Sequence, residues 1–183
     1  MTTLAAVLAA GDGSRFGGPK LKVDLRGRPL VTWALEAALA AGLDETVLVT
    51  GGEDLSAVVP AGVTILDNPD WADGQATSVQ VAVRHAEVQG HDAVVIGLGD
   101  SPMVPAGAWR AVAAVDAPVV TAEYEGARRP PVRLAREVWP LLPTEGDEGA
   151  RVLLKGRPDL VTAVPCAGDP RDVDTEGDLE RWS

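Results

Sequence analysis

The chain has 183 residues, of which 46% are hydrophobic, and a formal net charge of −11. This length suits one globular domain with a substantial core, and the acidic balance disfavours nucleic acid and anionic membranes as partners, because both bind basic surfaces. The one cysteine permits no internal disulfide, no apolar run is long enough to span a membrane, and the N-terminus lacks a basic signal region. We therefore expect a cytoplasmic protein.

Apolar runs alternate with amphipathic segments along the first two thirds of the chain. Strands are predicted at residues 4–9, 46–49, 63–66, 93–98 and 118–122, and helices at residues 29–41, 74–88 and 105–115. The pattern then loosens, and it predicts a short strand at 132–134, a helix at 146–155, a strand at 160–164 and a terminal helix at 175–182. This order indicates a single three-layer α/β/α domain over residues 1–183, with a mostly parallel sheet and helices on both faces.

A glycine-rich loop follows the first predicted strand. Residues 4–20 read LAAVLAAGDGSRFGGPK, which places two cations, Arg15 and Lys20, among or just after Gly11, Gly13, Gly17 and Gly18. Glycine lets the backbone approach a ligand closely, and successive N–H groups in such a loop form a concavity that binds anions. The loop therefore predicts a polyphosphate ligand, with an ordinary surface turn as the alternative.

This loop differs from the two commonest phosphate-binding loops. The dinucleotide fingerprint needs glycine at the sixth position counted from Gly11, where this chain has Phe16. The Walker pattern needs lysine directly after its second glycine and then serine or threonine, whereas Pro19 follows Gly18 and Leu21 follows Lys20. The sequence thus disfavours a nicotinamide enzyme and a P-loop NTPase.

Two aspartates are candidates for a metal site. Asp100 stands in GLGDSP, directly after the most apolar predicted strand, and Asp174 stands in DVDT, before the last predicted helix. Ligands bind outside the carboxyl ends of strands in open α/β sheets, and Mg²⁺ takes one or two carboxylates together with phosphate oxygens and waters. The alternatives are a turn residue at Asp100 and a helix cap at Asp174.

The first loop resembles the signature of a known family. LAAG followed by DGSRFGGPK is similar to the motif of nucleotidyltransferases related to molybdenum cofactor cytidylyltransferase, which have a Rossmann-like, glycosyltransferase-A-like fold. The resemblance extends over residues 4–179. It implies an NTP substrate held by Arg15 and Lys20, and a Mg²⁺ ion held by Asp100 and Asp174, with Arg15, Lys20 and Asp100 as catalytic residues.

Two further stretches match loops of this family. NPDWADGQATSV, residues 68–79, supplies Gly74 and Ser78 at nucleotide-contacting positions, and implies acceptor contacts from Ser78 and from Gln75. GDEGARVLL, residues 146–154, supplies Gly149, which would let a ligand approach, and Arg151, which would anchor an acceptor phosphate. The alternatives are a plain helix entry capped by Asp73 and a surface ion pair at Arg151.

The nucleotide base is inferred from one small feature. Related cytidylyltransferases have LAAG where guanylyltransferases have LAGG, and this chain has Leu8, Ala9, Ala10 and Gly11, which favours CTP. An alanine methyl at the edge of the base would crowd a purine more than a pyrimidine.

The acceptor implied by the resemblance is the molybdopterin form of the molybdenum cofactor, followed by handover to a molybdoenzyme or its chaperone. However, Pro130 stands where relatives carry the histidine of Gly-His-Pro, which puts the acceptor in doubt. A guanylyltransferase of the same cofactor, a transferase to another small phosphate, and a non-catalytic nucleotide- or cofactor-binding protein therefore remain as alternatives.

Overall fold

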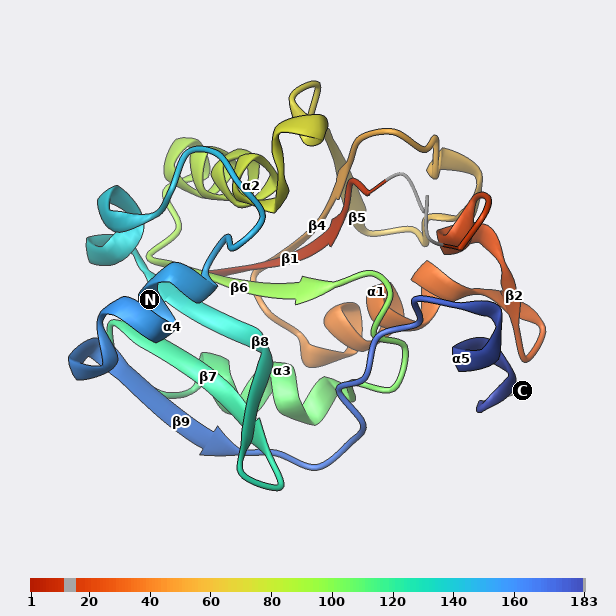
Figure 1. Ribbon diagram of the computed structural model, residues 1–183. Coiled ribbons are helices and arrows are strands. Elements are labelled where there is room, and N and C mark those ends of the chain that lie inside the picture. The colour runs from red at the N-terminus through yellow and green to blue at the C-terminus, as the bar shows by residue number, and fades with distance from the viewer. Residues whose placement is uncertain (12–15, 183) are drawn as a thin grey trace.

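The structure is a computed structural model that describes residues 1–11 and 16–182 (Figure 1). Its main sheet has seven strands in the order β5-β4-β1-β6-β8-β7-β9, and β8 is antiparallel to both of its neighbours while the other neighbouring pairs are parallel. The strands are β1 (Thr3–Ala9), β4 (Glu45–Thr50), β5 (Val63–Asp67), β6 (Ala93–Leu98), β7 (Val119–Tyr124), β8 (Ala127–Ala135) and β9 (Val161–Pro165). A small separate hairpin pairs β2 (Asp24–Leu25) with β3 (Arg28–Pro29).

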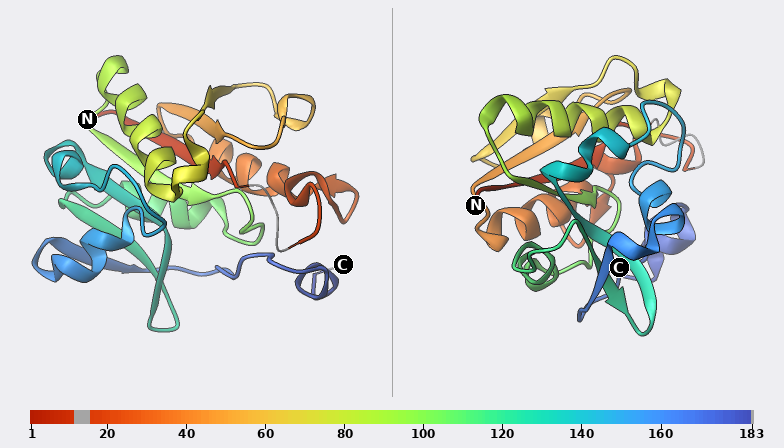
Figure 2. Two further views of the ribbon diagram at one scale, coloured as in Figure 1. Left: turned by 45° about the horizontal axis from the view of Figure 1, so that its top comes forward. Right: turned by 90° about the vertical axis from the view of Figure 1, so that its left-hand side faces the viewer.

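Helices cover both faces of the main sheet. They are α1 (Leu30–Ala41), α2 (Gln75–Gln89), α3 (Ala106–Ala113), α4 (Arg151–Gly156) and α5 (Glu176–Glu180). Figure 2 shows α1 and α3 on one face and α2 on the other. Short 3₁₀ turns lie at Lys20–Lys22, Ser56–Val58, Trp71–Asp73, Arg136–Leu141 and Pro158–Leu160. The predicted three-layer α/β fold with a mostly parallel sheet is confirmed.

The central strand β1 shows why two separate cores form. Side chains alternate faces along a strand, and every residue of β1 is buried. Ala5 and Val7 belong to the core beneath α1 and α3, whereas Leu4 and Leu8 belong to the core beneath α2. A strand buried on both faces reads as a continuous apolar run, which is what the sequence of β1 shows.

Several predicted boundaries were wrong in detail. Helix α4 begins at Arg151 rather than at residue 146, because positive φ angles at Gly146 (92°) and Gly149 (46°) keep the chain in a loop. Strand β8 is much longer than residues 132–134, since it continues as a hairpin with β7 toward the tip at Gly126. Asp73 does not cap α2, because Gly74 occupies the N-cap position and no side chain makes a capping hydrogen bond.

The segment after β9 carries the chain back across the carboxyl ends of the parallel strands. Figure 1 shows it running from β9 to α5, beside β2. The side chain of Arg26, next to β2, donates a hydrogen bond to the carbonyl of Trp182, whose ring is buried. Within the described residues, no helix is long and apolar enough to cross a membrane.

Candidate nucleotide-binding site

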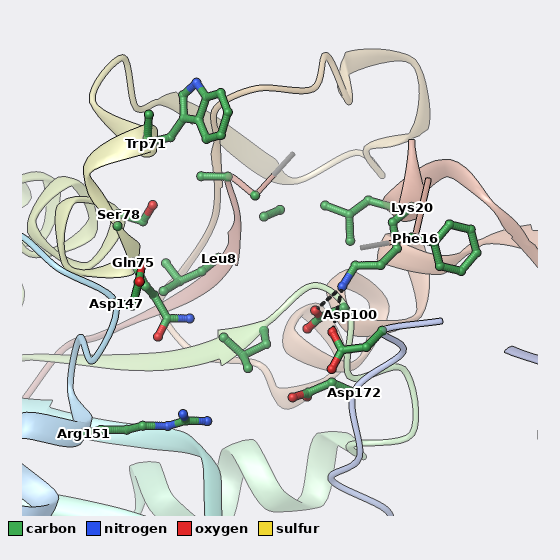
Figure 3. A pocket seen from close by; sticks show the side chains of 18 residues that line it. Leu8, Phe16, Lys20, Trp71, Gln75, Ser78, Asp100, Asp147, Arg151 and Asp172 are labelled. Atoms are coloured by element: carbon green, nitrogen blue, oxygen red, sulfur yellow. Dashed lines mark hydrogen bonds and ion pairs between the residues drawn. The ribbon is translucent and has the colours of Figure 1, made fainter. Parts of the chain in front are cut away.

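A cavity of about 640 Å³ lies at the carboxyl ends of β1 and β6 (Figure 3). Its walls come from the end of β1, the turn after the glycine-rich loop, the entry to α2, the segment before α4 and the segment before α5. The lining residues are Leu8, Ala9, Ala10, Gly11, Phe16, Lys20, Leu21, Trp71, Ala72, Gly74, Gln75, Ser78, Leu98, Asp100, Asp147, Arg151, Asp172 and Asp174. The position agrees with the rule that ligands bind beyond the carboxyl ends of strands in α/β sheets.

Lys20 connects the two aspartates that the sequence singled out. Its ammonium nitrogen lies 2.7 Å from Asp100 Oδ2 and 3.4 Å from Asp174 Oδ1. The Lys20 side chain is only 14% exposed, whereas the Asp174 side chain is 52% exposed. Residues separated by 80 and 154 positions in sequence thus meet at one point of the cavity.

A third carboxylate belongs to the same cluster, and the sequence reasoning missed it. Asp172 lines the cavity and accepts a hydrogen bond of 2.5 Å from the Ser101 hydroxyl. Between the two aspartates, Val173 is fully buried, and its N–H donates to the carbonyl of Asp100 at 2.9 Å. The alternation Asp-Val-Asp, with the apolar residue held in the core, is the sequence signal that could have identified Asp172.

The charges of this cluster shift two pKa values upward. Burial lowers the pKa of Lys20, but the nearby Asp100 and Asp174 carboxylates outweigh burial and raise it above its ordinary value. Burial, together with the negative charge of Asp100, raises the pKa of Asp172, and the hydrogen bond from Ser101 opposes this only in part. Among the described residues of this cluster, three carboxylates thus lie near one ammonium, so negative charge exceeds positive charge there.

This donor set fits a divalent cation that also binds a ligand. The described residues contain no group of three metal-binding side chains arranged as a complete protein site. Mg²⁺ needs only one or two carboxylates when phosphate oxygens and waters fill its other positions, and Asp100 and Asp174 provide that number.

The opposite wall of the cavity is polar and firmly held. Figure 3 shows Gln75, Ser78 and Arg151 on the side facing Lys20, Asp100 and Asp172. The side-chain amide of the buried residue Asn68 donates to the hydroxyls of Thr77 and Ser78, at 2.9 Å each. Since the Ser78 hydroxyl accepts this hydrogen bond, its own proton can be donated toward the cavity.

Glycine at position 74 has a clear structural reason. Its φ is 106°, and a β-carbon there would lie 2.4 Å from the carbonyl carbon of Gly146. The two segments are also joined by hydrogen bonds from Ala76 N–H to Gly146 O and from Gly146 N–H to Asp73 O. Glycine at position 74 therefore allows the loop before α4 to pack against the start of α2.

Trp71 forms the outer wall of the cavity near the end of β1. Its side chain packs against Gly51 and Gly52, the residues that follow β4. A β-carbon on Gly51 would lie 2.6 Å from the β-carbon of Trp71 and 2.7 Å from the carbonyl oxygen of Ala10. Gly51 thus lies close both to the Trp71 side chain and to the carbonyl of Ala10, the residue at which base selection was predicted.

The structure brings most of the predicted site residues to one cavity. Gly13 and Arg15 lie outside the described residues. Gly149 stands beside Gln75, where a β-carbon would be 3.2 Å from the amide oxygen of Gln75, and it does not line the cavity itself. Arg151 lines the cavity from the start of α4, and the described residues place no carboxylate within ion-pair distance of it.

The fold and this cavity define an α/β protein with a polar cavity at the carboxyl ends of its parallel strands. Residues 5–162 match the MobA-like NTP transferase domain family, and the chain belongs to this family. The resemblance inferred from the motifs is thereby confirmed, and the chain is a member of a nucleotidyltransferase family.

Individual relatives have diverse names. The chain is 30% identical to nicotine blue oxidoreductase of Paenarthrobacter nicotinovorans, over 96% of this chain and 93% of the relative. It is 31% identical to purine catabolism protein PucB of Bacillus subtilis, over 94% and 91% of the two chains. Among solved structures, it is similar to Rv0371C of Mycobacterium tuberculosis H37Rv in complex with manganese, with 26% identity, a TM-score of 0.81 and coverage of 100% and 98%.

Proposed function

We propose that this protein transfers CMP from CTP to the phosphate of the molybdopterin form of the molybdenum cofactor. An oxygen of the acceptor phosphate bonds to the α-phosphorus of CTP, and the bond from that phosphorus to the α,β-bridging oxygen breaks, so that pyrophosphate leaves. The observation that carries the proposal is that the Lys20 ammonium, just after the glycine-rich loop, lies between the carboxylates of Asp100 and Asp174.

The residues on the acidic side of the cavity would hold the reacting phosphates. Lys20, with Arg15 from the loop, would bind the phosphates of CTP and neutralise the leaving pyrophosphate. Asp100 and Asp174 would hold Mg²⁺, which supplies Lewis-acid charge at the α-phosphate when it is bound. The manganese bound by the solved relative supports a divalent ion in this family, and the two carboxylates suit Mg²⁺ as well.

The other walls would select and orient the substrates. Leu8, Ala9, Ala10 and Gly11 would border the cytosine, and the Ser78 hydroxyl and Gly74 segment would contact the nucleotide from the start of α2. Gln75, Ser78 and Arg151 would orient the acceptor phosphate opposite Lys20, with Gly149 holding the loop close. Because an acceptor phosphate is already ionised near neutral pH, the reaction requires no strong general base.

The proposed domain extends beyond the matched family region. Residues 163–182 supply Asp172 and Asp174 to the cavity and bury Val173 and Trp182 in the core beside α1. We therefore treat residues 1–183 as one nucleotidyltransferase domain.

The test is pyrophosphate release by the purified protein with Mg²⁺, each of the four NTPs, and molybdenum cofactor present or omitted. The proposal predicts release that needs both CTP and the cofactor, with a cytidylated product found by mass spectrometry. Release that needs GTP instead would identify a guanylyltransferase. Release that occurs only with another phosphate monoester would show that the acceptor is not the molybdenum cofactor.

Because one relative is named an oxidoreductase, a parallel assay follows NADH and NADPH oxidation with nicotine blue. Oxidation without any pyrophosphate release would overturn the proposal.

A further inference from the structure

A second chamber of about 520 Å³ adjoins the nucleotide cavity. The two cavities are direct neighbours, because five residues line both: Leu8, Gln75, Leu98, Arg151 and Asp172. Arg151 and Asp172 come from opposite sides of this boundary, as Figure 3 shows. A ligand that crosses the boundary therefore passes close to the acidic cluster around Lys20.

The floor of the second chamber is apolar. It is formed by Val79 of α2, Ile96 of β6 and Val132 of β8, whose exposed fractions are 1%, 4% and 4%. These side chains belong to the core beneath α2 and are fixed by packing on the sheet. Such a floor favours a flat, apolar part of a ligand over a hydrated one, because contact removes apolar surface from water.

The rim of the second chamber is cationic. Arg128 and Arg129 line it from the β7–β8 hairpin, and Arg151 and Lys155 line it from α4. Lys155 pairs with Glu148. Among the residues that the structure describes, none supplies a carboxylate within ion-pair distance of the three arginines, although acidic residues outnumber basic ones by 27 to 16. Three arginines that have no ion-pair partner among the described residues therefore line one chamber.

We propose that this chamber binds the non-reacting end of the acceptor, and that the acceptor carries an anionic group there, on a flat apolar body. The inference rests on the proposed function for the reacting end, whose phosphate would lie at Arg151 beside the nucleotide. Arg128 and Arg129 then bind the second anionic group, and the floor at Ile96 and Val132 binds the flat body. Guanidinium forks suit anionic oxygens of this kind.

Two naphthalene probes test the charge requirement without knowledge of the acceptor. Calorimetric titration compares naphthalene-1,5-disulfonate with the neutral naphthalene-1,5-diol, in the parent protein and in Arg128→Ala, Arg129→Ala and Arg84→Ala. Arg84 is the matched control, because it is exposed on α2 outside both chambers and also lacks a carboxylate partner among the described residues. All three arginines are exposed, so each variant is expected to keep the parent melting temperature.

The expected result is that the disulfonate binds at least about tenfold more tightly than the diol, and still binds when the protein is saturated with CTP. Arg128→Ala and Arg129→Ala each weaken disulfonate binding about tenfold, which is the effect of one lost charged hydrogen bond, and leave CTP affinity unchanged. Arg84→Ala is expected to change neither disulfonate binding nor CTP affinity. Displacement of the disulfonate by CTP, equal binding of the two probes, or equal losses in all three variants would each overturn the proposal.

A second measurement separates this proposal from the proposed function. In the pyrophosphate assay, Arg128→Ala and Arg129→Ala are expected to raise the KM for molybdenum cofactor about tenfold without changing the KM for CTP. An unchanged KM for the cofactor in an active enzyme overturns the chamber assignment and leaves the transferase function standing. Conversely, no pyrophosphate from any NTP, together with the expected probe binding, overturns the transferase function and supports an anionic-ring site.

Discussion

The Lys20 ammonium lies 2.7 Å from Asp100 Oδ2, and it reaches Asp174 on its other side at 3.4 Å. One cation therefore holds together two carboxylates, one from the turn after β6 and one from the segment before α5. Two nearby carboxylates repel each other when no cation lies between them, so Lys20 has a part in the unliganded protein as well as in the proposed reaction.

The first prediction concerns Lys20→Ala. We expect kcat/KM for CTP to fall about a hundredfold or more, because a charged group would be lost from the transferring phosphates. The circular dichroism spectrum should remain that of the parent, since the strands on either side keep their buried faces. Lys22→Ala is the matched control: that lysine is two positions away, is 38% exposed and lies 3.9 Å from Glu53. Normal turnover in Lys20→Ala would show that the lysine has only a structural role.

The second prediction separates metal binding from helix capping at the end of the chain. Thr175, rather than Asp174, caps α5, because its hydroxyl accepts from Asp178 N–H while the Asp178 carboxylate accepts from Thr175 N–H. We expect Asp174→Asn to lose Mg²⁺-dependent activity, as Asp100→Asn should, and to keep its melting temperature in the absence of metal. Thr175→Ala should lose about 0.5–2 kcal/mol of stability locally and keep its response to Mg²⁺.

Thermal melts with CTP, with and without Mg²⁺, check Asp174→Asn and Thr175→Ala. A ligand that binds only the folded state raises the melting temperature. A Mg²⁺-dependent rise that survives in Asp174→Asn would remove Asp174 from the metal site. A large fall in the melting temperature of Asp174→Asn without metal would instead restore a structural role for its carboxylate.

The third prediction is a pH dependence at Asp172. Its pKa is raised in the folded protein above the ordinary value of 3.8, so the folded state holds its proton more tightly than the unfolded state. The free energy of unfolding therefore falls as pH rises from the ordinary value through the folded value. Asp172→Asn should consequently melt higher than the parent at pH 8, without metal, and the difference should shrink toward pH 4.

Asp169→Asn provides a control of opposite sign. The hydrogen bonds from Arg171 hold the pKa of Asp169 below its ordinary value, so its contribution is present above that value and is lost as pH falls. This variant should melt below the parent at pH 8 and approach the parent at acidic pH. Parallel pH curves for Asp172→Asn and the parent would contradict a pKa of Asp172 that burial and the neighbouring carboxylates raise in the folded protein.

The sequence could predict the layer order and most of the site because both depend on local patterns. Continuous apolar runs predicted β1 and β6, and the residues that follow those strands, Gly11 and Asp100, line the cavity. Asp172 was missed because its role depends on a hydrogen bond from Ser101, 71 positions away. The second chamber was missed for the same reason, since the β7–β8 hairpin reaches it only through pairing of β8 with β6.

Glycine positions show the limit of motif reasoning in another way. A motif match assigned Gly74 to nucleotide contact, and the structure adds a backbone reason for the same residue, namely a positive φ and close packing on Gly146. We expect Gly74→Ala to lose roughly 2–4 kcal/mol of stability, because the left-handed backbone and the 2.4 Å approach to the Gly146 carbonyl carbon are both unfavourable for alanine. Chemical denaturation measures this loss. Gly107→Ala, where a β-carbon meets nothing within 4 Å, is the control.

The last prediction concerns base selection at Ala10. This residue follows β1 and lines the cavity, and it is 8% exposed. A base placed between Ala10 and Trp71 would contact the alanine methyl, and glycine at that position would leave room for a larger purine.

One methyl contact contributes about 1–3 kcal/mol to the discrimination between two substrates, so selection by Ala10 alone should be modest, about ten- to two-hundredfold. Ala10→Gly should therefore move the ratio of kcat/KM values for CTP and GTP toward GTP without abolishing the use of CTP. Ala6→Gly is the control, because it removes a methyl from β1 at a residue that does not line the cavity. A parent enzyme that prefers GTP contradicts the prediction, and an unchanged ratio in Ala10→Gly would place base selection at the Gly51–Gly52 turn or at Trp71.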